Sequence, residues 1–142
     1  MPVEFASVTV SFFIHATEDA QRLLSTVSDR LGLAEEELQQ ETVEGYHGNA
    51  IISAKAHVVG KRAQQIVTLL LRNLSQKAKE KIASELDKSI DEHDSLYLRL
   101  DRQSMENGLD ISDEEPIRVK LKPKFRVGGR NSMKESYMEM IV

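Results

Sequence analysis

The sequence predicts an α+β fold of two layers, a mostly antiparallel sheet with helices on one of its faces. Two kinds of segment support this prediction: some alternate apolar and polar residues, as strands do, and others place apolar residues three or four apart, as amphipathic helices do. The two kinds do not alternate regularly, and two strands follow each other directly, which argues against a doubly wound parallel sheet. The expected order is β-α-β-β-α-α-β-β.

The chain begins with a strand and a helix. Residues 5–15 alternate, and one side of this expected strand is apolar: Val8, Val10, Phe12 and Ile14. Apolar residues then recur at helical spacing as far as Leu31, so a helix is expected over Thr17–Leu31. Thr17 is its expected N-cap, and Gly32 stands where a glycine often ends a helix.

A hairpin and two helices follow. Leu38–Glu44 and Ala50–Val59 favour strands, and the short Gly-rich loop between them favours a hairpin. A helix is expected over Lys61–Leu74. A second apolar stripe, four residues apart from Leu74 to Ile90, predicts another helix that Ser75 is placed to cap. Near its end lies a cluster of Asp87, Asp91, Glu92, His93 and Asp94, in which the acidic residues are unfavourable to the helix dipole.

The last two expected strands carry the most informative pattern. Leu96–Leu100 alternates, residues 102–115 are loop-like with a helical turn at Gln103–Asn107, and Ile117–Val127 alternates again. Five cations share one face of this last segment: Arg118, Lys120, Lys122, Lys124 and Arg126. The other face is apolar: Ile117, Val119, Leu121, Phe125 and Val127. Pro123 interrupts it, which indicates an edge strand or a bulge.

Length and composition predict one domain over residues 1–142, with a core at 5–127 and a Gly-Gly joint and tail at 128–142. The absence of cysteine excludes disulfides, thiolate zinc sites and a cysteine nucleophile. No apolar run is long enough to span a bilayer, and the N-terminus does not read as a signal peptide, so we expect a cytoplasmic protein with no membrane partner. The net charge of −4 is unevenly distributed along the chain. Residues 1–54 are acidic, whereas residues 117–134 are basic and include no acidic residue.

Four segments together resemble a known family: residues 7–12, the hairpin Gly45–Gly60, residues 96–103 and residues 116–122. They resemble the archaeal family of predicted RNA-binding proteins, of which one branch is described as a predicted exosome subunit. The resemblance covers most of residues 5–127. It implies a two-layer α+β fold similar to the ribosomal protein that binds 5S rRNA, and it implies RNA as the partner. It assigns no site residue.

The candidate site follows from strand parity alone. If helices cover the apolar face, the opposite face carries cations beside aromatic rings such as Phe13 and Tyr97, a mixture suited to phosphates and bases. The RNA-binding candidates are Arg118, Lys120, Lys122, Lys124, Arg126, Lys55, His57 and Arg99. Five phosphates neutralised on a single strand predict a log–log salt slope of about −3.5.

Other interpretations stay open. The cations also suit a solvated face that protects a sheet edge, and the same face suits a dimer interface. The alternative function is a protein-interaction or assembly module in which the sheet edge or the tail mediates self-association. Gly128-Gly129-Arg130 suits either a phosphate loop or a flexible joint, and Tyr46 and His47 suit either base stacking or a turn.

Catalysis finds no support in the sequence. Nucleophile-elbow, zinc-protease and dinucleotide-binding motifs are absent, and no two of the four histidines are four residues apart. We therefore expect a protein that is not an enzyme, with no cofactor and no metal.

Overall fold

A five-stranded sheet forms the centre of the structure, which is a computed structural model that describes residues 3–44, 48–126 and 128–141. The strands are β1 (Phe5–Ile14), β2 (Gln39–Glu44), β3 (Ala50–Val59), β4 (Leu96–Leu100) and β5 (Ile117–Pro123). Their order is β2-β3-β1-β5-β4, and all four neighbouring pairs are antiparallel. The first and last strands of the chain therefore pair at the middle of the sheet.

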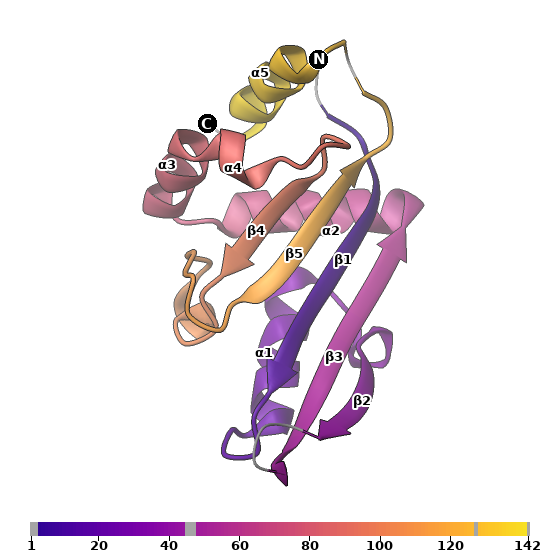
Figure 1. The fold of residues 1–142 in the computed structure, drawn as a ribbon, viewed down its shortest axis with the longest axis vertical. Coiled ribbons are helices and arrows are strands. Elements are labelled where there is room, and N and C mark those ends of the chain that lie inside the picture. Colours follow the sequence, from indigo (N-terminus) through magenta and orange to yellow (C-terminus); the bar gives the residue numbers. More distant parts are fainter. Residues whose placement is uncertain (1–2, 45–47, 127, 142) are drawn as a thin grey trace.

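Helices cover one face of this sheet. They are α1 (Ala20–Leu31), α2 (Gly60–Asn73), α3 (Gln76–Ser84), α4 (Leu86–Ser89) and α5 (Arg130–Ile141), with short 3-10 turns at Glu35–Glu37 and Met105–Asn107. In Figure 1, α1 and α2 lie behind the sheet, and α3, α4 and α5 gather near the upper ends of β4 and β5. No helix of the described residues covers the other face of the sheet. The two-layer α+β prediction is thus confirmed.

Alternation along the strands places the core between the sheet and these helices. Side chains on the covered face are buried throughout β1, β4 and β5, as expected from the period of two. Ile66, Val67 and Leu70 of α2 meet them from the helical layer. The opposite side of the strands, which we call the open face, is left to polar and charged residues.

The N-cap of helix α1 lies two residues later than predicted, and the helix itself begins at Ala20. Its N-cap is Asp19 and not Thr17, because the Asp19 carboxylate accepts a hydrogen bond from the backbone N–H of Arg22 at 3.2 Å. The other end is as predicted: Gly32 has φ of 73° and its N–H donates to the carbonyl of Ser28. A Cβ there would also approach Leu69 to 2.9 Å, so two constraints favour glycine.

Strand β5 is shorter than predicted. It ends at Pro123, where the register of β1 shifts between Phe5 and Ser7. Of the two interpretations of Pro123, the bulge is confirmed and the edge strand is wrong, because β5 lies between β1 and β4. After the bulge the backbone N–H of Lys124 donates to the carbonyl of Glu4, and Phe125 is 63% exposed rather than buried. Val127 lies outside the described residues.

The stripe from Leu74 to Ile90 is divided between two helices. Ser75 caps α3 as predicted, accepting from the N–H of Ala78 at 3.0 Å. The helix breaks at Glu85, and the short α4 follows. Both pieces keep the predicted residues buried.

The sequence predicts no element after Arg130, yet α5 forms there. Three of its side chains, Met133, Tyr137 and Ile141, are four residues apart and fully buried in the common core. A single stripe of three such residues among polar neighbours is too weak a pattern to predict a helix. Most of the segment expected to be a joint and tail, Arg130–Ile141, is therefore a helix packed on the core.

Candidate nucleic-acid interface

Strand register places the predicted site residues in adjoining rows across the open face. One row runs Lys55–Ser11–Arg118–Arg99 from β3 to β4. The next runs His57–Thr9–Lys120–Tyr97, and a third runs Val59–Ser7–Lys122. Six of the eight candidates lie in these rows, and we call them the basic surface: Lys55, His57, Arg99, Arg118, Lys120 and Lys122. Rows are about 7 Å apart, since each strand residue rises about 3.3 Å.

Aromatic and hydroxyl groups lie among these cations. The ammonium of Lys120 is 5.6 Å from the ring centre of Tyr97, whose hydroxyl donates to Asp91 at 3.1 Å. The Thr9 hydroxyl is hydrogen-bonded to Nδ1 of His57 at 2.8 Å. The surface therefore offers positive charge, a ring face and hydroxyl groups side by side.

Most cations of the basic surface are not neutralised by the protein itself. Within residues 3–44, 48–126 and 128–141, the side chains of Lys55, Arg118 and Lys122 form no hydrogen bond or ion pair. Arg99 contacts Asp113 at 3.2 Å, but both side chains are largely exposed, and such a pair contributes little. The arrangement leaves charge available for an anionic ligand.

Two predicted residues lie elsewhere. Because β5 ends at Pro123, Lys124 and Arg126 do not continue the row of cations along the strand. The Arg126 guanidinium is 2.7 Å from a carboxylate oxygen of Asp94, a side chain only 2% exposed. The Lys124 ammonium lies 5.5 Å from the ring centre of Phe125. Strand parity alone could not predict that the chain leaves the strand after Pro123 and takes these two cations away from the row.

Two cations of α5, Arg130 and Lys134, contact the acidic cluster near the end of α4. Arg130 donates to the carbonyls of Asp87, Ile90 and Asp91, so its guanidinium caps the helix end. Lys134 lies 2.5 Å from Asp87 and, through this hydrogen bond, lowers the pKa of that carboxyl. Arg130 is thus engaged with the protein's own carbonyls.

Asp91 is held by the same corner of the fold. One of its carboxylate oxygens accepts from the N–H groups of His93 and Ser95, both at 2.9 Å. Burial by itself would raise the pKa of Asp91, but these two donors and the Tyr97 hydroxyl together lower it. The cluster is therefore a structural one that also fixes the Tyr97 ring beside the basic surface.

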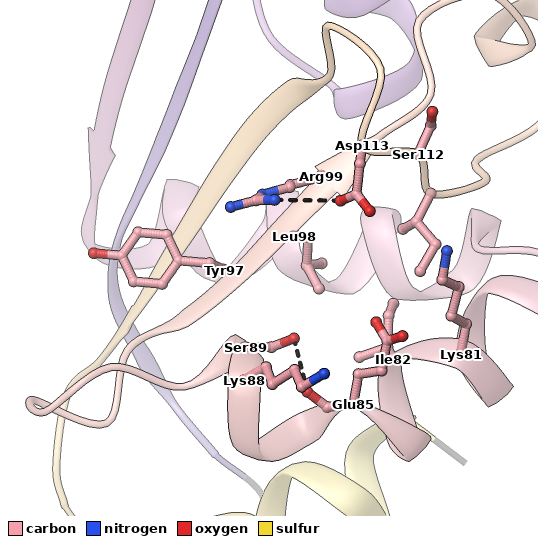
Figure 2. Close-up of a pocket in the computed structure, with 11 residues that line it drawn as sticks. Lys81, Ile82, Glu85, Lys88, Ser89, Tyr97, Leu98, Arg99, Ser112 and Asp113 are labelled. Carbon is pink, nitrogen blue, oxygen red and sulfur yellow. Dashed lines mark hydrogen bonds and ion pairs between the residues drawn. The ribbon is translucent and has the colours of Figure 1, made fainter.

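The sequence did not predict a cavity of about 300 Å³ at the outer edge of β4 (Figure 2). Its charged walls come from α3, α4 and the residue between them, from β4, and from the loop before β5. They carry both signs of charge: Lys81, Glu85, Lys88, Arg99 and Asp113. In Figure 2, Arg99 and Asp113 face each other across its upper rim. Residues so far apart in the chain give no local motif that could have predicted it.

Neither metal-ligand clusters nor membrane helices occur in the described part of the chain. No three histidine, aspartate or glutamate side chains there are arranged to hold a metal ion. None of its helices is long and apolar enough to cross a membrane. Tyr46 and His47 lie outside the described residues.

An antiparallel sheet with helices on one face and a cationic open face is an architecture suited to binding a polyanion. A family model described as RNA binding matches residues 7–123. Because that span is most of the chain, the protein belongs to this family. Among curated protein sequences none matches the chain.

Solved structures of three archaeal proteins share the fold over nearly their whole length. A protein of Archaeoglobus fulgidus is 25% identical, with a TM-score of 0.79 over 96% of this chain and 99% of its own. One from Sulfolobus solfataricus is 22% identical, with a TM-score of 0.76 over 95% and 96%. A DUF54 protein of Methanothermobacter thermautotrophicus is 22% identical, with a TM-score of 0.75 over 97% and 98%.

Proposed function

We propose that this protein binds RNA through the basic surface, without catalysing a reaction, and that it does so mainly by neutralising phosphates. One observation carries the proposal: Lys55, Arg118 and Lys122 present charge on the open face that no described residue neutralises. Lys120 adds a fourth cation beside the Tyr97 ring. Family membership supports RNA as the polyanion.

The composition of the open face suits RNA better than a small anion. Its rows are spread over four strands, so a ligand with many separated charges matches it better than one compact phosphate. The hydroxyls of Ser7, Thr9 and Ser11 stand between the cations and are suited to phosphate oxygens and 2′-hydroxyls. His57 and Arg99 extend the same surface on either side.

The cellular setting of this activity is a further part of the proposal. The resemblance to the predicted exosome-subunit branch supports a role in RNA processing in the cytoplasm. The resemblance to the ribosomal protein that binds 5S rRNA supports a structured RNA as an alternative target. Lys124, beyond the end of β5, would then extend the contact only where the RNA passes the bulge, whereas Arg126 is already paired with Asp94.

The test compares RNA affinity of the full chain with that of two matched triple variants. The first changes Arg118, Lys120 and Lys122 to Glu on the open face. The second changes Arg72, Lys77 and Lys81 to Glu on the helical layer, so the net charge is the same. We expect the first variant to lose RNA binding and the second to keep it. The introduced carboxylates repel phosphates strongly only where the RNA is bound.

Equal loss in both variants would contradict the proposal, because it would mean that net charge and not the basic surface decides binding. Circular dichroism of both variants checks that the fold persists. All six side chains lie on the protein surface or are half exposed, so no core contact is removed.

One observation favours the second candidate function, self-association through a sheet edge. Within the described residues, β2 pairs with β3 and with no other strand, and its side chains are mostly exposed. The outer edge of β4 is partly occupied, because Asp91 and Ser112 donate backbone hydrogen bonds to Ser95 and Arg99. Sedimentation over a wide concentration range tests this candidate: a constant monomer mass would contradict it.

A further inference from the structure

A second cavity opens on the open face, directly beside the basic surface. Its volume is about 220 Å³, and it lies where β1, β3 and the start of β5 meet. Four open-face side chains line it: Ser11, Phe13, Ser53 and Arg118. His15 and Glu115, in contact at 2.9 Å, close its far wall.

The Phe13 ring is the exposed apolar feature of this cavity. It is 47% exposed although it stands on a central strand, opposite Ser53 of β3. Its backbone is held firmly, since the carbonyl of Phe13 accepts a hydrogen bond from Arg102 at 2.8 Å. Arg102 is itself buried, 8% exposed, and is paired with Glu18 at 2.9 Å. The ring therefore projects from a rigid support.

Arg118 connects the cavity to the basic surface. Its side chain lines the cavity and also stands in the row next to Lys120. Phosphates bound along Lys122, Lys120 and Arg118 would bring the adjoining nucleotide to Phe13. From this continuity we propose that the cavity receives one unpaired base, stacked on Phe13, and that the protein prefers single-stranded RNA.

The size and chemistry of the cavity agree with this ligand. Its volume is below the roughly 300–1,000 Å³ of cavities that hold drug-sized ligands, which suits a single planar base. An aromatic ring can stack on any of the four bases. The hydroxyls of Ser11 and Ser53 can form hydrogen bonds with the polar edge of the stacked base. Bases inside a duplex are stacked on their neighbours and cannot enter, so duplex RNA would use the basic surface alone.

This inference rests on the proposed function, and its test uses a change that leaves charge unaltered. Affinity is measured for Phe13→Ala with two probes, a single-stranded oligouridylate and a blunt RNA duplex of equal length. We expect a roughly five- to hundredfold loss for the single strand, which is the range for one stacked base. Duplex affinity and the salt slope should stay unchanged, because no cation is lost.

A matched control and a spectroscopic probe sharpen the test. Phe125→Ala removes the other strongly exposed phenylalanine, outside the cavity, and should affect the single strand much less. The chain has no tryptophan, so Phe13→Trp introduces a single tryptophan; this variant should keep binding, and its tryptophan fluorescence should be quenched by the oligonucleotide. Met138→Trp on α5 should not be quenched.

The outcomes separate the two proposals. If charge reversal on the basic surface abolishes binding while Phe13→Ala changes nothing, the base site is wrong and the phosphate contacts stand. If Phe13→Ala weakens single strand and duplex equally, the single-strand preference is wrong. If the wild type binds neither RNA, both proposals fail.

Discussion

Whether a cation is available to bind RNA depends on whether it is already paired with an acidic residue of the protein. Lys122 and Arg126 belong to the same basic run of the sequence, but Lys122 stands on the open face while Arg126 is bound to the buried Asp94 carboxylate. Asp94 also has a positive φ of 62°, so this corner depends on its hydrogen bonds. A buried carboxylate without its partner is costly. Arg126 is therefore a stabilising residue first.

This difference predicts opposite results for two alanine variants. Arg126→Ala should lower the free energy of unfolding by about 1–3 kcal/mol, because Asp94 loses a charged hydrogen-bond partner. Lys122→Ala should leave stability nearly unchanged and weaken RNA binding. Urea unfolding and RNA titration at one salt concentration measure both effects. A stable Arg126→Ala protein that has lost RNA affinity would show that the ion pair is not structural.

At the scale of an element, one aromatic residue of α5 joins the helix to both the sheet and the corner around Asp94. The Tyr137 ring is buried and stacks on Phe5 with ring centres 6.3 Å apart. Its hydroxyl donates to the carbonyl of Asp94 at 2.5 Å, which ties α5 to the same corner as Arg126. Burial, with Asp94 and Asp91 nearby, raises the pKa of Tyr137 well above its ordinary value.

The raised pKa has a consequence for stability at alkaline pH. An unfolded Tyr137 ionises as pH rises above about 10, whereas the folded one keeps its proton, so stability is lost in that range. Tyr137→Phe should lack this loss. At neutral pH it should be less stable by about 1–2 kcal/mol, since the Asp94 carbonyl loses a donor. Urea unfolding between pH 7 and 10.5 measures the difference, with Tyr97→Phe as the exposed control.

The elements that the sequence predicted are those with a strong local period. The strands follow from alternation, and α1 and α2 follow from apolar stripes bounded by a cap or a glycine. What it could not predict depends on contacts between distant residues. The bulge opposite Pro123 needs β1 as a neighbour, and α5 is stabilised by the core it packs against rather than by its own pattern. The sequence predicts Arg126 on the last strand for the same reason, since its contact with Asp94 joins residues far apart in the chain.

At the scale of the whole molecule, the local charge of the open face differs from the net charge of the chain. The net charge is −4, yet the open face carries Lys55, Arg118, Lys120 and Lys122, while the first third of the chain has nine acidic residues and only two basic ones. Screening limits such fields to about 8 Å at physiological salt, so a phosphate on the open face meets the local cations. An acidic protein can therefore hold RNA by a basic surface.

The salt dependence of affinity measures how many of these cations are used. Each phosphate neutralised on a single strand contributes about −0.7 to the slope of log affinity against log salt. Four lysine and arginine side chains of the open face, Lys55, Arg118, Lys120 and Lys122, have no ion pair within the described residues, and together they predict a slope of about −2.8. This slope is shallower than the −3.5 that the sequence predicts from five cations on one strand, a set that includes Lys124 and Arg126. Lys55→Ala should reduce the slope by about 0.7, and Arg126→Ala should not change it. A wild-type slope near zero would mean that RNA, if bound, is held without phosphate contacts, and the basic surface would then have no part in binding.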